Sequence, residues 1–242
     1  TTMIVGKIVL RGAEKLIKRL KKYVSDSLDV PFEEVTYNKG FFQRNGVYVV
    51  DFLEAARSYE EKHGPLEVIG DYSHPAELYW DDDRCQGDAY QGYAWGANVL
   101  EVEVDMDTWE VRPLRDTVVV DVGTAINPLL AVGQVEGGSL QGLGYGYLEV
   151  IEVEGGKYKN DRLSNYIIPT SVDCPDFFVE LTEIPCSKGA FGAKGLGEMP
   201  LSGGGPAVAA AIEHATGLFS NKLPITGEVL TALELKGDER RS

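Results

Sequence analysis

Glycine is concentrated in two segments of this 242-residue chain, and this concentration limits what the chain can fold into. The first segment, residues 133–146, holds six glycines in fourteen residues. A glycine inside a helix costs roughly 0.5–1 kcal/mol relative to alanine, so this density calls for close approach of the backbone to another helix or to a bulky cofactor. Helix packing explains most of these glycines, but not Gln134 and Gln141, which lie two turns apart on one helical face. Two interpretations therefore stay open: helix packing alone, or a cofactor contact through one of these glutamines.

The second glycine-rich segment covers residues 188–206 and leads into a predicted helix. Its glycines allow several backbone N–H groups to converge on an anion, and the start of the helix adds its positive end. The segment has neither the phosphate-loop pattern nor a dinucleotide fingerprint preceded by a strand. The sequence therefore disfavours a nucleotide site.

Glu198 is the one charged residue in the run from 195 to 211. A stiff turn between Gly197 and Pro200 predicts that its carboxylate lies in apolar surroundings, which suits a general base working near neutral pH. The alternative is an exposed glutamate in a loop. Lys194, four residues earlier, has three interpretations: an ion pair with Glu198, a donor to a phosphate, or a solvated side chain.

The local patterns predict an α+β fold, with mixed sheets and packed helices in one contiguous unit over 1–242. Residues 99–105 alternate between apolar and acidic side chains, which predicts a half-buried strand. Residues 117–122 are continuously β-branched or apolar up to an aspartate, which predicts a central strand buried on both faces. The remaining elements are helices at 12–24, at 51–63 and from Pro206 to Gly217, and strands within 28–50, at 147–153 and at 177–183.

The net charge of −15 argues against binding to nucleic acid or to an anionic membrane surface. The charge is uneven, because residues 1–50 carry a net +4 and residues 51–110 a net −13. The acidic block is either a solvated face or a surface for a basic partner. Residues 67–96 also hold six Tyr and Trp side chains, which predicts an ordered loop or an interface. Three cysteines without metal-ligand spacing, and no secretion signal in the sequence, are typical of a cytoplasmic protein.

Three motifs occur in order along the chain. They are Asp-Val-Gly-Thr-Ala-Ile-Asn-Pro at 121–128, Gly-Gln-Val-Glu-Gly at 133–137 with Gln-Gly-Leu-Gly at 141–144, and Lys-Gly-Leu-Gly-Glu-Met-Pro at 194–200. Together with the opening Gly-Lys-Ile-Val-Leu-Arg-Gly-Ala at 6–13, they resemble the C-terminal part of the molybdenum subunit in the xanthine dehydrogenase/aldehyde oxidase family. The similarity spans nearly the whole chain.

The resemblance implies the fold of the family's second molybdopterin-binding domain and a molybdopterin cofactor, often in the cytosine dinucleotide form. Molybdenum would be held through the pterin, with no direct protein ligand. Such enzymes oxidise an electron-poor carbon of a heteroaromatic ring or an aldehyde with oxygen from water. By match to the motifs, Glu198 would be the catalytic base and Gln134 would hydrogen-bond an oxygen ligand of the metal. Four residues would wrap the cofactor with backbone groups: Lys194, Gly195, Leu196 and Gly197.

A complete molybdenum subunit of this family is several times longer than this chain. The resemblance therefore implies that the N-terminal half of the subunit is a partner, together with an iron–sulfur subunit, an FAD subunit and a small-molecule substrate. The alternative is a non-catalytic scaffold or assembly module derived from the same domain. The joint presence of Gln134, Lys194 and Glu198 favours the catalytic interpretation.

Overall fold

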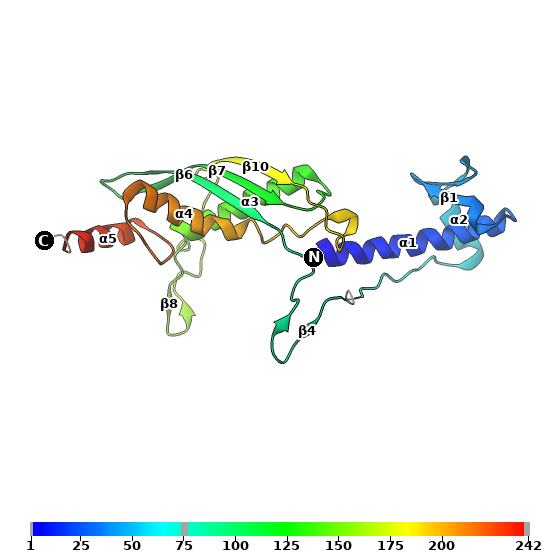
Figure 1. Cartoon of the computed structure of the whole chain (residues 1–242), viewed down its shortest axis with the longest axis horizontal. Helices are drawn as coiled ribbons and strands as arrows, with labels where there is room; N and C mark the ends of the chain where they lie inside the picture. Colours follow the sequence, from blue (N-terminus) through cyan, green and yellow to red (C-terminus); the bar gives the residue numbers. More distant parts are fainter. Residues whose placement is uncertain (1, 74–76, 240–242) are drawn as a thin grey trace. The chain divides into compact units, whose positions relative to one another are not determined.

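The computed structural model describes residues 2–73 and 77–239 (Figure 1). Its contacts divide the chain into two compact units, Thr1–Ala89 and Tyr90–Ser242. The sequence predicts one contiguous unit over 1–242 instead, because the residues around the division are acidic and aromatic and do not have the composition of a linker. Each unit has hydrophobic core clusters of its own.

The N-terminal unit consists of a long helix, a three-stranded antiparallel sheet and a second helix. Its elements are α1 (Thr2–Ser27), the 3₁₀ turn η1 (Phe32–Glu34), β1 (Val35–Asn38), β2 (Phe41–Arg44), β3 (Val47–Asp51) and α2 (Phe52–His63). The helix predicted at 12–24 is confirmed and is longer at both ends. The strands predicted within 28–50 and the helix predicted at 51–63 are confirmed as well.

A small core joins the helices of this unit to its sheet. Leu20 and Val24 of α1 pack with Val35, Phe42 and Ala55, all of which are buried. The carboxylate of Asp51 caps α2 by accepting a hydrogen bond from the amide of Glu54 at 2.7 Å. The first part of α1, up to residue 19, contributes no buried side chain to this core.

Basic side chains of α1 hold the acidic segment that follows α2. Arg11, Lys15 and Arg19 donate hydrogen bonds to the backbone carbonyls of Asp71, Ile69 and Glu67, at 3.1, 2.9 and 2.7 Å. Part of the predicted acidic block therefore faces positive charge within its own unit. In the described residues 67–73 and 77–95 the segment is loop with one short hairpin, β4 (Trp80–Asp81) and β5 (Gln86–Gly87), which confirms the predicted loop there; residues 74–76 of that prediction lie outside the described residues.

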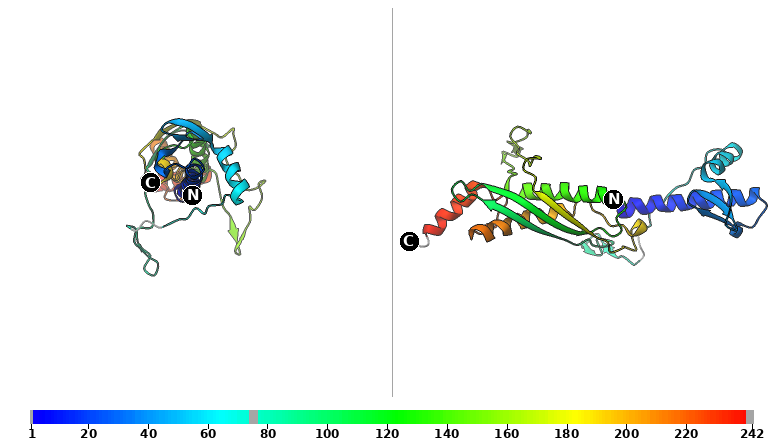
Figure 2. Two further views of the ribbon diagram at one scale, coloured as in Figure 1. Left: turned by 90° about the vertical axis from the view of Figure 1, so that its right-hand side faces the viewer. Right: turned by 90° about the horizontal axis from the view of Figure 1, so that it is seen from above.

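The C-terminal unit is built on a three-stranded sheet with strand order β10-β7-β6. The strands are β6 (Gly96–Val104), β7 (Val111–Asp121) and β10 (Asp176–Thr182). β6 pairs antiparallel with β7, whereas β10 pairs parallel with it, so that Thr182 lies opposite Asp121. Figure 2 shows the three strands side by side in one twisted sheet. A mixed sheet of this kind confirms the predicted α+β class.

Two helices, α3 (Pro128–Tyr147) and α4 (Leu201–Thr216), cover one face of this sheet. Alternate side chains of the strands point to them, including Val118 and Val120 of β7, which are fully buried. The other face is exposed or half-exposed in this chain, and Thr117 and Val119 lie on it. The prediction that 117–122 is central is confirmed, but burial on both faces is wrong because only one face is covered. The alternation predicted for 99–105 is confirmed.

The remaining elements of this unit are short or terminal. They are the hairpin β8 (Val153–Glu154) and β9 (Lys157–Tyr158), the 3₁₀ turn η2 (Ala190–Gly192) and the helix α5 (Gly227–Glu239). The predicted strand at 147–153 is wrong, because α3 extends to Tyr147 and the next five residues are irregular. The predicted strand at 177–183 is confirmed, and the local patterns did not predict α5.

Glycines allow the backbones of α3 and α4 to lie in direct contact. A Cβ added to Gly142 would lie 2.4 Å from the carbonyl oxygen of Leu201, and one added to Gly204 would lie 2.3 Å from the backbone of Gly142. A Cβ added to Gly138 would lie 2.9 Å from the side chain of Pro200, and one added to Gly146 would lie 2.8 Å from that of Val208. The three glycines of α3 recur every fourth residue, so they form one side of the helix. Helix packing is therefore confirmed as the reason for these glycines.

Candidate functional site

The C-terminal end of β7 brings the predicted site segments together. The segment after β7 pairs with residues 192–194 through three backbone contacts: Lys194 N to Val122 O at 2.9 Å, Thr124 N to Gly192 O at 3.0 Å, and an antiparallel bridge between Gly123 and Ala193. Residues 194–198, here called the site loop, start at this contact. The loop ends where α4 begins, next to the N-terminal half of α3.

Lys194 makes a buried ion pair with Asp121, the last residue of β7. The two side chains are only 12% and 4% exposed, respectively. Burial disfavours the charged form of Asp121, but hydrogen bonds from Lys194 and from the amides of Gly123 and Ile184 hold its pKa below the ordinary value of 3.8. The ammonium of Lys194 is thus bound to Asp121, an arrangement that differs from all three predicted interpretations of this side chain.

Gln134 connects α3 to the site loop. Its side-chain amide Nε2 donates a hydrogen bond to the carbonyl oxygen of Gly197 at 3.1 Å. Gln141 lies on the same exposed side of the helix, two turns further on, and borders a cavity of about 680 Å³ next to the start of α4. The structure therefore brings Gln134, Lys194 and Gly197 together, and it leaves the role of Gln134 toward a metal ligand as a prediction.

Glu198 lies at the end of the site loop and is exposed in this chain. Its backbone carbonyl accepts a hydrogen bond from Leu201 N at 3.2 Å, in the turn that opens α4. Pro200, in the same turn, is buried against Gly138 of α3. The turn is present as predicted, but the described residues leave Glu198 exposed instead of placing it in the predicted apolar surroundings.

The site loop and the adjacent side of α3 leave backbone accessible. Among the described residues, none accepts a hydrogen bond from the amides of residues 195–198. A Cβ added at four glycines would meet no atom within 4 Å: Gly133, Gly137, Gly195 and Gly197. Unpaired amides beside a helix N-terminus are typical of backbone that binds an anionic group. The residues present therefore fit an organic cofactor that carries phosphate and hydrogen-bond acceptors.

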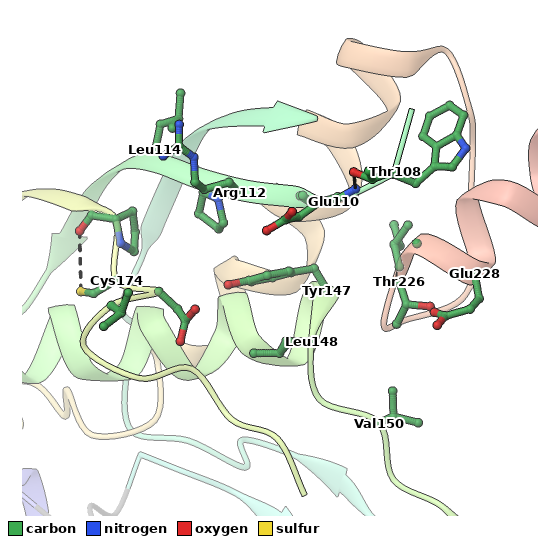
Figure 3. Close-up of a pocket in the computed structure, with 18 of the residues that line it drawn as sticks. Thr108, Glu110, Arg112, Leu114, Tyr147, Leu148, Val150, Cys174, Thr226 and Glu228 are labelled. Carbon is green, nitrogen blue, oxygen red and sulfur yellow. Dashed lines mark hydrogen bonds between the residues drawn. The ribbon is translucent and has the colours of Figure 1, made fainter. Parts of the chain in front are cut away.

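A larger cavity, of about 1030 Å³, lies at the opposite end of β7 and α3 (Figure 3). It is lined by the start of β7, the end of α3 and the segments around Cys174 and Thr226. Burial raises the pKa of Tyr147 to about 12, with the charge of Asp173 adding to the effect. Neither Glu198 nor any predicted cofactor-binding residue lines this cavity. The volume of a cavity alone therefore does not identify the site. We place the candidate site at the site loop, because the predicted catalytic and cofactor-binding residues lie there.

Asp121 is the site residue to which sequence reasoning gave no role. It belongs to a quoted motif, and its signal is a charged residue at the end of a continuous apolar strand. No group of three His, Cys, Asp or Glu in the part of the chain that the structure describes could hold a metal ion. None of the described helices is long and apolar enough to cross a membrane.

The fold and the accessible backbone are typical of a domain that holds a bulky organic cofactor through main-chain groups. A model of the molybdopterin cofactor-binding domain family matches residues 1–175, and the chain belongs to this family. The resemblance to the xanthine dehydrogenase and aldehyde oxidoreductase proteins is thereby confirmed. The site loop lies beyond the matched residues.

The chain matches part of the length of two curated relatives. The chain is 36% identical over 135 residues to the xanthine dehydrogenase molybdenum-binding subunit of Escherichia coli O157:H7, covering 55% of this chain and 18% of that protein. It is 27% identical over 233 residues to the gamma subunit of the 6-hydroxypseudooxynicotine dehydrogenase complex of Paenarthrobacter nicotinovorans, covering 94% of this chain and 28% of that protein. The chain thus spans well under a third of the length of either relative.

A solved structure shares the fold. Quinoline 2-oxidoreductase from Pseudomonas putida 86 superposes with a TM-score of 0.71 at 25% identity, over 92% of this chain and 28% of that one. The expectation of a molybdenum hydroxylase fold is therefore confirmed.

Proposed function

We propose that this chain forms the part of a molybdenum hydroxylase active site that wraps the molybdopterin cofactor and supplies the catalytic base, Glu198. The observation that carries the proposal is the site loop, which is anchored by the Lys194–Asp121 pair and by Gln134, and which leaves its amides accessible beside Glu198. The proposal extends the family membership to a role for particular residues.

Several groups of this chain would hold the cofactor. The accessible amides from Gly195 to Gly197 would donate to it, and the open glycines of α3 would let it approach the helix backbone. Gln134 would place its amide beside the group while keeping its bond to Gly197. Lys194 would contribute through its backbone, since its ammonium is bound to Asp121. We propose the cytosine dinucleotide form because the motifs of this chain resemble those of the family in which this form occurs.

When bound, the molybdenum cofactor supplies a centre that accepts two electrons from the substrate carbon. Glu198 would take up the proton that the water-derived nucleophile releases, a role that requires a carboxylate within hydrogen-bond reach. Since Glu198 is exposed here, the N-terminal half of the molybdenum subunit would cover it and exclude water. Iron–sulfur and FAD partners would then carry the electrons away.

We propose a heteroaromatic ring or an aldehyde as the substrate. Xanthine and quinoline, which appear in the names of two relatives, are heteroaromatic. Both substrate classes present an electron-poor carbon to a nucleophile. Xanthine, quinoline and benzaldehyde are therefore suitable probe substrates.

The test uses a complex reconstituted with the rest of the molybdenum subunit and its electron-transfer partners. We expect Glu198→Gln to lower turnover of the best probe substrate by at least 100-fold, because it removes the base and keeps the side-chain shape. Molybdenum per complex should stay at the wild-type level. Glu213→Gln, which changes an exposed glutamate of α4, is the matched control and should keep full turnover.

Two results would contradict the proposal. Turnover that survives Glu198→Gln would show that Glu198 is not the base. A wild-type complex without molybdenum, from cells that make the cofactor, would support the non-catalytic scaffold.

A further inference from the structure

We propose that Asp121 is a positioning residue: acting through Lys194, it fixes where the site loop begins and thus where the loop amides and Glu198 lie. The proposal rests on the function proposed above for the site loop. The experiment below separates the two, because it measures the loop itself as well as turnover.

Asp121 uses both carboxylate oxygens to connect separate segments of the chain. Oδ2 binds the ammonium of Lys194. Oδ1 accepts hydrogen bonds from the amide of Gly123 at 3.0 Å and from that of Ile184 at 3.4 Å. One buried side chain therefore holds its own turn, the segment after β10 and the start of the site loop.

The site loop has few other anchors. After Lys194, Leu196 and Met199 pack against the core cluster that contains Val122, and Gln134 donates a hydrogen bond to Gly197 O. Gly195 has open space around it and no bond from its amide within the described chain. The polar contacts at the start of the loop are therefore those of Lys194, through its backbone amide and through its ammonium.

The pair is buried, so its two charges depend on one another. A buried ammonium that loses its carboxylate has a strong tendency to move to another anion or to water. Glu198, four residues along the chain, is the acid nearest in sequence to Lys194. Loss of Asp121 would thus free the start of the loop and expose the proposed base to a competing ion pair.

Hydrogen exchange at backbone amides measures whether the site loop stays attached to β7, and this measurement needs no cofactor. The amides of Lys194 and Thr124 donate to Val122 O and Gly192 O, so their protection reports whether the loop stays attached to the end of β7. In the full chain, we expect Asp121→Asn to reduce protection at both amides by at least tenfold, while amides of α3 keep theirs. In the reconstituted complex, turnover per molybdenum should fall by at least tenfold with little change in KM, since a misplaced base affects the chemical step.

A second buried aspartate of β7 offers a matched control. Asp116 is fully buried and accepts a hydrogen bond from Asn98, without a bond to the site loop. Asp116→Asn should leave loop protection and turnover unchanged. Glu198→Gln should abolish turnover and keep loop protection, which distinguishes failure of the base from failure of the anchor.

A double variant covers the case in which Asp121→Asn does not fold. Asp121→Asn combined with Lys194→Met removes both buried charges and keeps the approximate volume of the pair. We expect this variant to fold, with weak protection at the amides of positions 124 and 194 and low turnover. Wild-type protection and turnover, in either the single or the double variant, would overturn the proposal.

Discussion

The two sides of α3 use the same residue type for opposite purposes. On the packed side, Gly138 leaves room for the ring of Pro200, and Gly142 allows the backbone of α4 to touch that of α3. On the open side, Gly133 and Gly137 have no atom of this chain where a Cβ would be. A glycine weakens a helix wherever it stands, but only the packed glycines gain a contact that offsets this cost within the chain. The open glycines have a reason only if something outside this chain approaches the helix.

The largest expected effect is on the packed side. Gly142→Ala should lower the free energy of unfolding by about 1–3 kcal/mol, because the new methyl group overlaps backbone atoms of α4 that cannot move alone. Trp109 is buried in the core of the same unit, so its fluorescence follows this loss in a denaturant titration. Wild-type stability in this variant would mean that the helices separate at little cost.

An intermediate effect concerns the charge buried beneath the helices. Asn98, which bonds Asp116, lies against Gly203 of α4, and burial raises the pKa of Asp116 despite that bond. The folded state therefore holds the proton of Asp116 more tightly than the unfolded state does. As the pH rises above the ordinary aspartate pKa of 3.8, the free energy of unfolding falls. Asp116→Asn should raise the free energy of unfolding by about 1 kcal/mol at pH 7 and leave it unchanged near pH 3. A benefit equal at both pH values would contradict this explanation.

The smallest effect on stability is on the open side and has the opposite sign. Gly137→Ala should raise the free energy of unfolding by roughly 0.5–1 kcal/mol, because alanine favours helix and the methyl group meets nothing in this chain. In the reconstituted complex the same variant should retain less cofactor, measured as molybdenum per complex. Full retention would show that the open side of α3 does not face the cofactor.

Local patterns predicted most elements, and they failed where a neighbour decides the structure. The alternation after Tyr147 looked like a strand, but no described strand pairs with residues 148–152. The helix α4 begins at Leu201 rather than at Pro206 because the intervening glycines, which resemble a loop, are needed against α3 and Asn98. A local sequence pattern does not show which distant residues such glycines contact.

The same limit applies to the candidate site. Gln134, Lys194 and Glu198 stood out in the sequence, and the structure places all three in or beside the site loop. The partner of Lys194 could not be predicted, because Asp121 reaches it only through backbone contacts between segments that are distant in sequence. The exposure of Glu198 could not be predicted either, because it depends on which neighbours the fold brings to the turn before α4.

The parallel pairing of β10 with β7 has a consequence for how the chain folds. This pairing needs the whole crossover through α3, and the two anchors of the site loop join residues 73 and 63 positions apart. Contacts that close such long loops form after local helices and hairpins. The chain loses the entropy of the loop before it gains the energy of the contacts. We therefore expect the site loop to be completed late in folding. Under the proposed function, the cofactor would thus bind only to chains that have finished folding.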